Sequence, residues 1–303
     1  MYDKSDPRSG LTNAAAPISA GAFSAASYVK FYETAAAEHA SGVRQWYARG
    51  QNFVLAYAEL APEATPGDLF TRHHQADEYV VLLPDIESRA EFITSTERVT
   101  VDGFSLVIVP PGDSDIVMPT GGRIIRLFTT QATDLLEKAA NNRDYEVLNP
   151  RVAPLQAWPT PPDGYRIRAY SLDVPRSEGR FGRIFRCTTF MVNYLDPVNG
   201  PRDPTKMSPH HHDDFEQGSL AVAGRFVHHL RWPWTTDMTQ WRADDHEACA
   251  TPSLAVIPPP AIHTTEANGA GVNQLVDIFC GPRMDFSQQA GWVLNADEYP
   301  LPV

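Results

Sequence analysis

The spacing of hydrophobic and polar positions changes near the start of the chain and separates a predicted helix from a long β-rich remainder. Residues 24–41 are rich in alanine, and Tyr28, Val29, Tyr32 and Ala35 recur at helical spacing. An apolar stripe with this period predicts a helix packed on the first domain.

The first half then shows the pattern of short strands. Its β-branched and aromatic runs are separated by proline, glycine and aspartate, which is typical of an antiparallel sandwich or barrel. The runs are QNFVLAYAEL (51–60), EYVVLLP (78–84), RVTVDGFSLVIVP (98–110) and GRIIRLFTT (122–130). A second helix is predicted at residues 133–143, with Thr133 as its N-cap.

A proline-rich segment separates this half from the next. Residues 149–164 contain five prolines in sixteen residues, and proline joins neither a helix interior nor a central strand. Strand-like runs resume after it, at residues 166–174, 182–195, 219–232, 253–259 and 271–280. The predicted organisation is an N-terminal extension with a helix (1–44), a first β-barrel (45–148), the linker (149–164) and a second β-barrel (165–303).

Two blocks of sequence indicate an internal repeat. In the first half RHHQADEYVVLLPD precedes SLVIVPPGDSD, and in the second HHHDDFEQGSLAVAG precedes SLAVIPPPAIH. Superposing the blocks pairs four positions of each half, namely Arg72 with His210, His74 with His212, Glu78 with Glu216, and Asp115 with His263. Only the second half keeps four residues of metal-ligand type.

These four residues of the second half form a candidate metal site. His210 and His212 are two residues apart, so on a strand both imidazoles project from one face, about 7 Å apart. Glu216 has the same parity, His263 follows fifty-one residues after His212, and His211 faces the other way. Three imidazoles and one carboxylate suit Fe, Mn, Co, Ni, Cu or Zn and leave coordination positions open.

The motifs resemble those of the cupin superfamily, H-x-H-x(3,4)-E followed by a glycine, and P-x-G-x-x-H. HHHDDFE (210–216) matches the first, with Gly224 slightly later than usual, and PPPAIH (258–263) matches the second with proline in place of glycine. The resemblance covers both halves. It implies a mainly β bicupin, with two jelly-roll barrels, a few short helices and one divalent metal in the second barrel.

The first barrel keeps the cupin spacing but not the ligands. PPGDSD (110–115) has the turn, yet Asp115 and Arg72 stand where histidines are expected. A guanidinium repels a cation and is expected to pair with Glu78 or Asp115. We therefore expect no metal in this degenerate barrel, whose role is structural unless an organic anion binds Arg72.

The net charge and the cysteine content indicate which classes of partner and which cellular compartment to expect. The net charge is −12, from 25 basic and 37 acidic residues, which argues against nucleic acid and anionic lipid. The three cysteines form no C-x-x-C pair, and no apolar run approaches the roughly 18 residues of a membrane span. We expect a cytoplasmic protein with a small-molecule substrate. A homo-oligomer is one of the assemblies that remain open.

Three functions remain open because a fold does not settle an activity. The first is a non-haem Fe(II) dioxygenase of a small aromatic or enolic acid, with His228 moving protons and an aromatic wall formed by Phe226, Trp232, Trp234 and Trp241. The second is a redox-neutral isomerase or hydrolase of a sugar or keto acid, using Zn or Mn as Lewis acid. The third is a non-enzymatic ligand-binding or storage protein.

Overall fold

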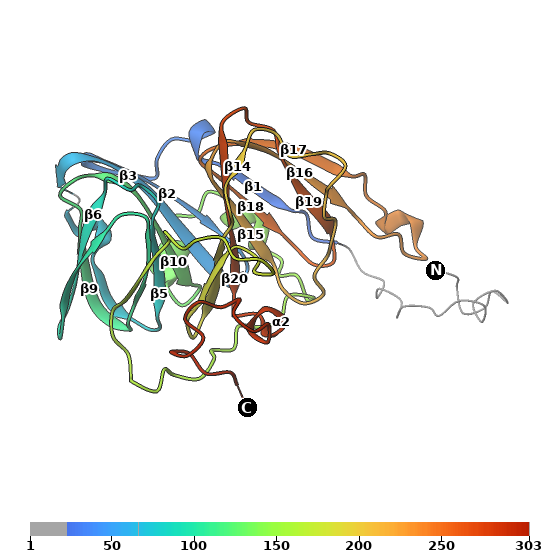
Figure 1. Ribbon diagram of the computed structural model, residues 1–303. Helices are drawn as coiled ribbons and strands as arrows, with labels where there is room; N and C mark the ends of the chain where they lie inside the picture. The colour runs from blue at the N-terminus through green and yellow to red at the C-terminus, as the bar shows by residue number, and fades with distance from the viewer. Residues whose placement is uncertain (1–22, 66, 303) are drawn as a thin grey trace.

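Short β-branched and aromatic runs form strands along most of the chain, as the sequence pattern predicts. The computed structural model describes residues 23–65 and 67–302, and its strands assemble into four antiparallel sheets. Two sheets enclose each of two interiors, so that two jelly-roll barrels lie side by side (Figure 1). The predicted mainly β, two-barrel fold is confirmed.

The first barrel packs a six-stranded sheet against a four-stranded one. The larger sheet has the order β11 (Arg168–Ser171), β8 (Ser105–Val109), β5 (Tyr79–Leu83), β10 (Gly122–Thr129), β3 (Phe53–Thr65) and β2 (Glu38–Arg49). The smaller has the order β4 (Arg72–Gln75), β9 (Gly112–Val117), β6 (Arg89–Thr94) and β7 (Arg98–Asp102). Large apolar side chains such as Val81, Phe92 and Phe128 fill the space between the sheets.

The second barrel packs a seven-stranded sheet against a three-stranded one. The larger sheet has the order β1 (Ser27–Lys30), β18 (Ser253–Ile257), β15 (Gln217–Ala223), β20 (Val272–Cys280), β13 (Phe190–Tyr194) and β12 (Arg183–Arg186), with β14 (Val198–Asn199) beside β20. The smaller has the order β17 (Asp245–Ala250), β16 (Arg225–Arg231) and β19 (Ile262–Ala267). Its buried residues include many polar ones, among them Gln217, Ser219, His228 and Asp277.

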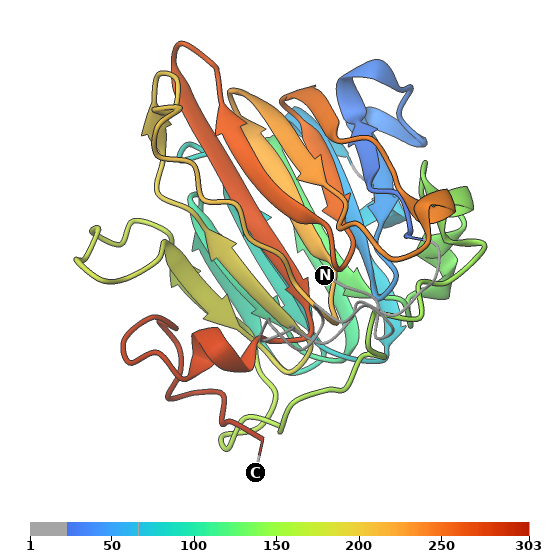
Figure 2. The same cartoon turned by 90° about the vertical axis from the view of Figure 1, so that its right-hand side faces the viewer.

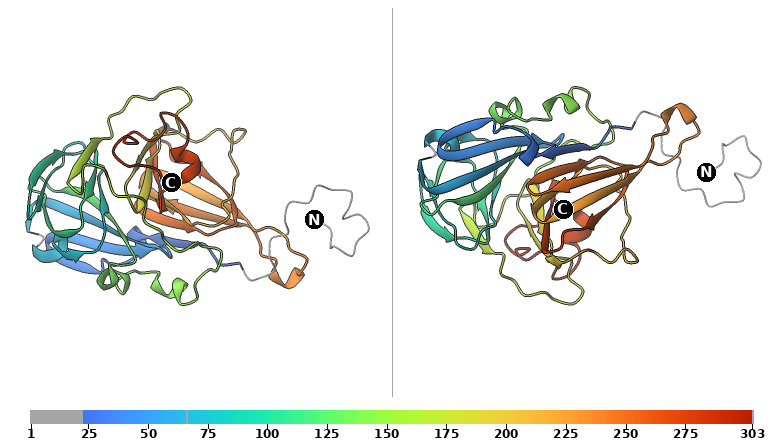
Figure 3. Two further views of the ribbon diagram at one scale, coloured as in Figure 1. Left: turned by 90° about the horizontal axis from the view of Figure 1, so that it is seen from below. Right: turned by 90° about the horizontal axis from the view of Figure 1, so that it is seen from above.

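The large sheets of the two barrels pack against each other. Figure 2 shows the strands of the second barrel in front of those of the first, and Figure 3 shows the two barrels from both ends. Val80 and Leu82 of β5 and Leu254 and Val256 of β18 belong to one continuous core between the sheets. Both faces of these strands are buried, which explains why YVVLL and SLAVI lack a polar alternate position.

Each barrel receives an edge strand from the other half of the sequence. β1 pairs with β18 of the second barrel, with Ser27 opposite Val256. β11 pairs with β8 of the first barrel, with Ser171 opposite Ser105. This exchange of strands adds main-chain hydrogen bonds to the apolar contact between the barrels.

The prediction of a helix at residues 24–41 is wrong. This segment forms β1, a short 3-10 turn (Phe31–Glu33) and the start of β2. Val29 and Phe31 are buried in the core between the barrels, and pairing with β18 outweighs the modest helix propensity of the alanines. Residues 1–22 of the predicted extension lie outside the described residues.

Helices are few and short. The predicted helix at 133–143 shrinks to four residues, and Ala132 rather than Thr133 is its N-cap, without a side-chain capping bond. The helical elements are α1 (Thr133–Leu136), α2 (Met284–Ser287) and the 3-10 turns at Phe31–Glu33, Gly67–Phe70, Asn142–Tyr145 and Met238–Gln240. None in the described part of the chain has the length and apolar character that a membrane span requires.

Candidate metal centre

Three histidines meet at one end of β19. The backbone N–H of His210 donates to the carbonyl of His263 (3.0 Å), and the N–H of His263 donates back (2.7 Å). This bridge, together with the two-residue spacing of His212, brings one ring nitrogen of each within 4.8 Å of the others. Ligand nitrogens at about 2.1 Å from one ion lie about 3 Å apart when adjacent. The triad therefore fits one ion after small side-chain movements.

Burial prepares the inner two histidines for a metal. His212 and His263 are 7% and 3% exposed, and burial lowers the pKa of His212 to about 3 and of His263 to about 4. Both imidazoles are therefore neutral at pH 7, the state that metal binding requires. The Nδ1 atoms of His210 and His263 each lie 2.9 Å from a backbone carbonyl, to which they donate, so the Nε2 lone pairs remain for an ion.

The structure does not place Glu216 with the three histidines. Its carboxylate accepts a hydrogen bond from the backbone N–H of Gln51 in the first barrel (2.6 Å), and burial raises its pKa to about 7. The prediction from strand parity fails because residues 211–216 form a loop rather than a continuous strand. Side chains alternate between faces only while the backbone stays extended.

Gln217 takes the position that was predicted for Glu216. Its Oε1 atom lies 2.9 Å from His212 Nε2 and 3.4 Å from His263 Nε2, and the side chain is buried. The sequence contains a signal for this: the cupin motif allows three or four residues between the second histidine and the acid, and Gly224 comes later than usual when counted from Glu216. The motif predicts a carboxylate at this position, and the structure places the neutral amide of Gln217 there.

Asp277 orients this amide. On β20 it accepts a hydrogen bond from Gln217 Nε2 (3.1 Å), which directs the carbonyl oxygen of Gln217 toward the histidines. Burial raises the pKa of Asp277 to about 7, against the opposing effects of Arg283 and Gln217. Such a partner behind a ligand fixes the geometry of a metal site.

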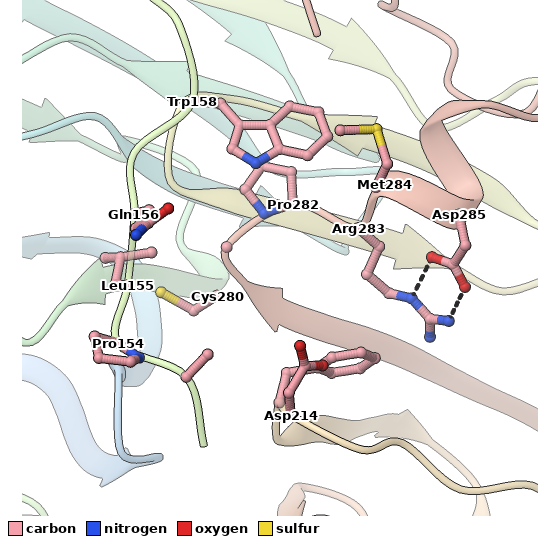
Figure 4. Close-up of a pocket in the computed structure, with 13 residues that line it drawn as sticks. Pro154, Leu155, Gln156, Trp158, Asp214, Cys280, Pro282, Arg283, Met284 and Asp285 are labelled. Carbon is pink, nitrogen blue, oxygen red and sulfur yellow. Dashed lines mark hydrogen bonds and ion pairs between the residues drawn. The ribbon is translucent and has the colours of Figure 1, made fainter. Parts of the chain in front are cut away.

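Aromatic rings border the triad, but they are not the predicted ones. Phe215 stacks on His212 at 4.3 Å between ring centroids, and Phe279 meets Phe215 edge-on at 5.6 Å. The guanidinium of Arg283 lies over both rings. Phe215 and Arg283 also line a cavity of about 500 Å³, shown in Figure 4, together with Trp158.

The predicted aromatic wall of Phe226, Trp232, Trp234 and Trp241 is dispersed. Trp232 is buried in a separate cluster, and Phe226 belongs to another. Trp234 and Trp241 stack on each other at the surface, 74% and 40% exposed. The four residues do not form one wall because only Phe226 lies on β16, whereas Trp232, Trp234 and Trp241 come after the end of the strand.

His228 faces the interior of the second barrel, outside the triad. It is fully buried, and its Nδ1 atom lies 3.1 Å from the hydroxyl of Thr265 on β19. Burial lowers its pKa to about 4, and among the described residues its Nε2 atom has no hydrogen-bond partner. His229 faces outward and contacts His246 and Glu266.

The corresponding positions of the first barrel carry different contacts. Arg72 pairs with Asp134 through two hydrogen bonds of 2.6 and 3.0 Å, not with Glu78 or Asp115 as predicted, because α1 brings Asp134 within its reach. Asp115 accepts from Thr71, and the side chain of His74 is 93% exposed.

The two barrels, their exchanged edge strands and the histidines inside one of them define the class: this is a bicupin fold.

No protein-family model matches the sequence, and a search of curated proteins finds no match. Among solved structures, a mutant of Bacillus subtilis oxalate decarboxylase aligns over 87% of this chain and 79% of its own, with a TM-score of 0.56 and 14% identity. A formate complex of Lactobacillus farciminis oxalate decarboxylase aligns over 87% and 88%, with a TM-score of 0.56 and 12% identity. A third structure, reported for the Mn(II) centres of the Bacillus enzyme, has a TM-score of 0.55 and 13% identity over 87% and 79% of the two chains.

Proposed function

We propose that the second barrel binds one divalent metal ion through His210, His212, Gln217 and His263. The convergence of three imidazoles and one amide oxygen on a common point carries this proposal. Nitrogen and oxygen donors of this kind suit Fe(II), Mn(II) and other first-row ions. Four protein ligands leave two coordination positions of an octahedral ion open, one for the substrate and one for a second ligand such as dioxygen or water.

The charge of the donor set favours an anionic substrate. Three imidazoles and an amide are all neutral, so the protein ligands leave the two positive charges of the ion uncompensated. Asp277, the carboxylate that accepts a hydrogen bond from Gln217, has a pKa raised to about 7 by burial. A carboxylate or enolate binding at the open positions would supply the missing negative charge in a site of low dielectric.

We infer that the first candidate activity is dioxygenation of a small aromatic or enolic acid. Fe(II), when bound, would supply the dioxygen chemistry that amino-acid side chains lack. The chain's own contribution is orientation and exclusion of water. Phe215 and Phe279 give the site an apolar border. In the same barrel interior, the Nε2 atom of His228 has no hydrogen-bond partner among the described residues, so it is available to hydrogen-bond a bound substrate.

A redox-neutral, metal-dependent reaction is the second candidate. The three similar structures reported above are of oxalate decarboxylases, and one of them is described for its Mn(II) centres. A decarboxylation, isomerisation or hydrolysis would use the same neutral site with Mn(II) or Zn(II) as Lewis acid and would need no net oxidant.

Oxygen consumption separates the two candidates. We expect the full chain, loaded anaerobically with Fe(II), to consume oxygen with at least one member of a panel of aromatic and enolic acids, and His263→Ala not to do so. An oxygen electrode and mass spectrometry of the products measure this. Turnover of an acid by the Mn(II)-loaded protein without oxygen uptake would instead establish the redox-neutral reaction.

A further inference from the structure

Glu216 has a counterpart in the first barrel that makes the same kind of contact. Glu78 immediately precedes β5, as Glu216 precedes β15. Glu78 accepts hydrogen bonds from the backbone N–H of Thr188 (3.0 Å), the hydroxyl of Thr188 (2.8 Å) and the hydroxyl of Tyr299 (2.8 Å). Each glutamate therefore reaches across the barrel contact to a hairpin of the other half, at Thr188 or at Gln51.

The receiving hairpins are built alike. Asn141 accepts from the N–H of Arg49 and donates to its carbonyl, at 2.9 and 2.8 Å. Asn295 makes the same two bonds with Arg186, at 3.1 and 2.9 Å. The repeated asparagines clamp the two hairpins that hold the glutamates.

A tyrosine follows each asparagine by four residues. Tyr299 donates to Glu78, and Tyr145 is the corresponding hydrogen-bonding neighbour of Glu216. The ring of Tyr145 is held in place by the guanidinium of Arg49, 4.8 Å from its centroid. The chain thus has two crossed contacts of one design, each joining a glutamate of one barrel to a hairpin amide and a tyrosine of the other.

The two contacts differ in the residue that comes directly after the glutamate. Glu78 is followed by Tyr79, whose hydroxyl lies 2.9 Å from that of Ser114 in the core of the first barrel. Glu216 is followed by Gln217, the fourth donor of the metal centre. A second bond holds the same loop, because the N–H of Ala153 donates to the carbonyl of Asp214 (2.7 Å). The loop between His212 and Gln217 is thereby tied to residues outside the second barrel.

We propose that the first barrel positions the metal ligand Gln217 by holding Glu216 through Gln51 and Tyr145. The barrel without metal ligands would then be part of the metal centre of its neighbour, and Glu216 and Tyr145 would be positioning residues rather than ligands. This inference rests on the proposed metal centre. Adjacent residues share a backbone, so loss of the Glu216 contact frees the start of β15, where the Gln217 amide must face the histidines.

Titration of the full chain with Mn(II) tests the proposal, with Glu78 and Tyr299 as matched controls. The free ion and the spectrum of the bound ion are followed by electron paramagnetic resonance, and thermal unfolding is followed by circular dichroism. We expect Glu216→Ala to raise the Kd for Mn(II) about tenfold or more and to alter the spectrum of the bound ion. Tyr145→Phe should change both in the same direction by a smaller factor. Glu216→Gln, which can still accept from the Gln51 N–H, should recover most of the affinity.

The control variants separate positioning from general stability. Glu78→Ala and Tyr299→Phe should lower the melting temperature while keeping the Kd for Mn(II) within about twofold of the wild type, as expected of distant sites. Equal Kd values for Glu216→Ala and Glu78→Ala would overturn the inference and leave the metal centre intact. If Glu216→Ala does not fold, Tyr145→Phe decides, because its ring packing is retained. A wild-type chain that binds no Mn(II) would overturn the metal centre and the inference with it.

Discussion

Replacing His263 by alanine should abolish stoichiometric binding of a divalent metal. His263 contributes both a ring nitrogen to the triad and, through its backbone, the two hydrogen bonds that hold His210. Alanine keeps the backbone bonds and removes the donor, so the loss reports on coordination. We expect the Kd for Mn(II) to rise by more than about a hundredfold, beyond the 10–100-fold typical of residues behind the ligands.

His74→Ala is the matched control for this substitution. In the sequence repeat His74 is the counterpart of His212. The side chain of His74 is nevertheless 93% exposed and lies near Asp113 rather than in the barrel interior. Its removal should leave metal content and affinity unchanged. Isothermal titration and elemental analysis of both variants measure the result, and retained stoichiometric binding in His263→Ala would contradict the proposed centre.

The fold was predictable because strand patterns and turn residues repeat in both halves. Runs such as YVVLL and SLAVI predicted strands, and the structure confirms them as β5 and β18. The exchange of edge strands was not predictable from local pattern. β1 is stabilised by β18, more than two hundred residues away in the sequence, and local spacing around Val29 favoured a helix.

The candidate site was predictable only in part, for a geometric reason. His210 and His212 are two residues apart, and a backbone bridge joins His210 to His263. Both histidine positions belong to the sequence motifs, so the grouping of the three could be predicted. Whether Glu216 or Gln217 faces them depends on the conformation of a six-residue loop, and a shift of one residue moves a side chain to the other face. The sequence therefore predicted the grouping of the three histidines, while the structure places the side chain of Gln217 rather than Glu216 beside them.

The contrast between the barrels shows how one scaffold supports two roles. In the first barrel, Arg126 lies fully buried over Phe70, and Arg72 lies over Phe128, so cationic groups and apolar rings fill the interior. In the second, polar side chains such as Ser219 and His228 take interior positions. The packed first barrel is suited to be a rigid support, as its proposed hold on Glu216 requires.

Replacing Gln217 by alanine decides which of the two neighbouring residues is the ligand. The amide oxygen is the one described protein oxygen that contacts both His212 and His263, and without it the ion would keep three imidazoles alone. We expect the Kd for Mn(II) to rise about a hundredfold, more than in Glu216→Ala, because a donor is lost rather than its support.

Gln217→Glu supplies the opposite test of the same position. A carboxylate there would provide an oxygen donor with negative charge and should restore the affinity that alanine loses. It would also face Asp277, which now accepts a hydrogen bond from the Gln217 amide (3.1 Å), and two buried carboxylates at this distance raise each other's pKa. The recovered affinity should therefore fall steeply as the pH is lowered, unlike that of the wild type. An unchanged Kd in Gln217→Ala, together with a lost site in Glu216→Gln, would return the fourth position to Glu216.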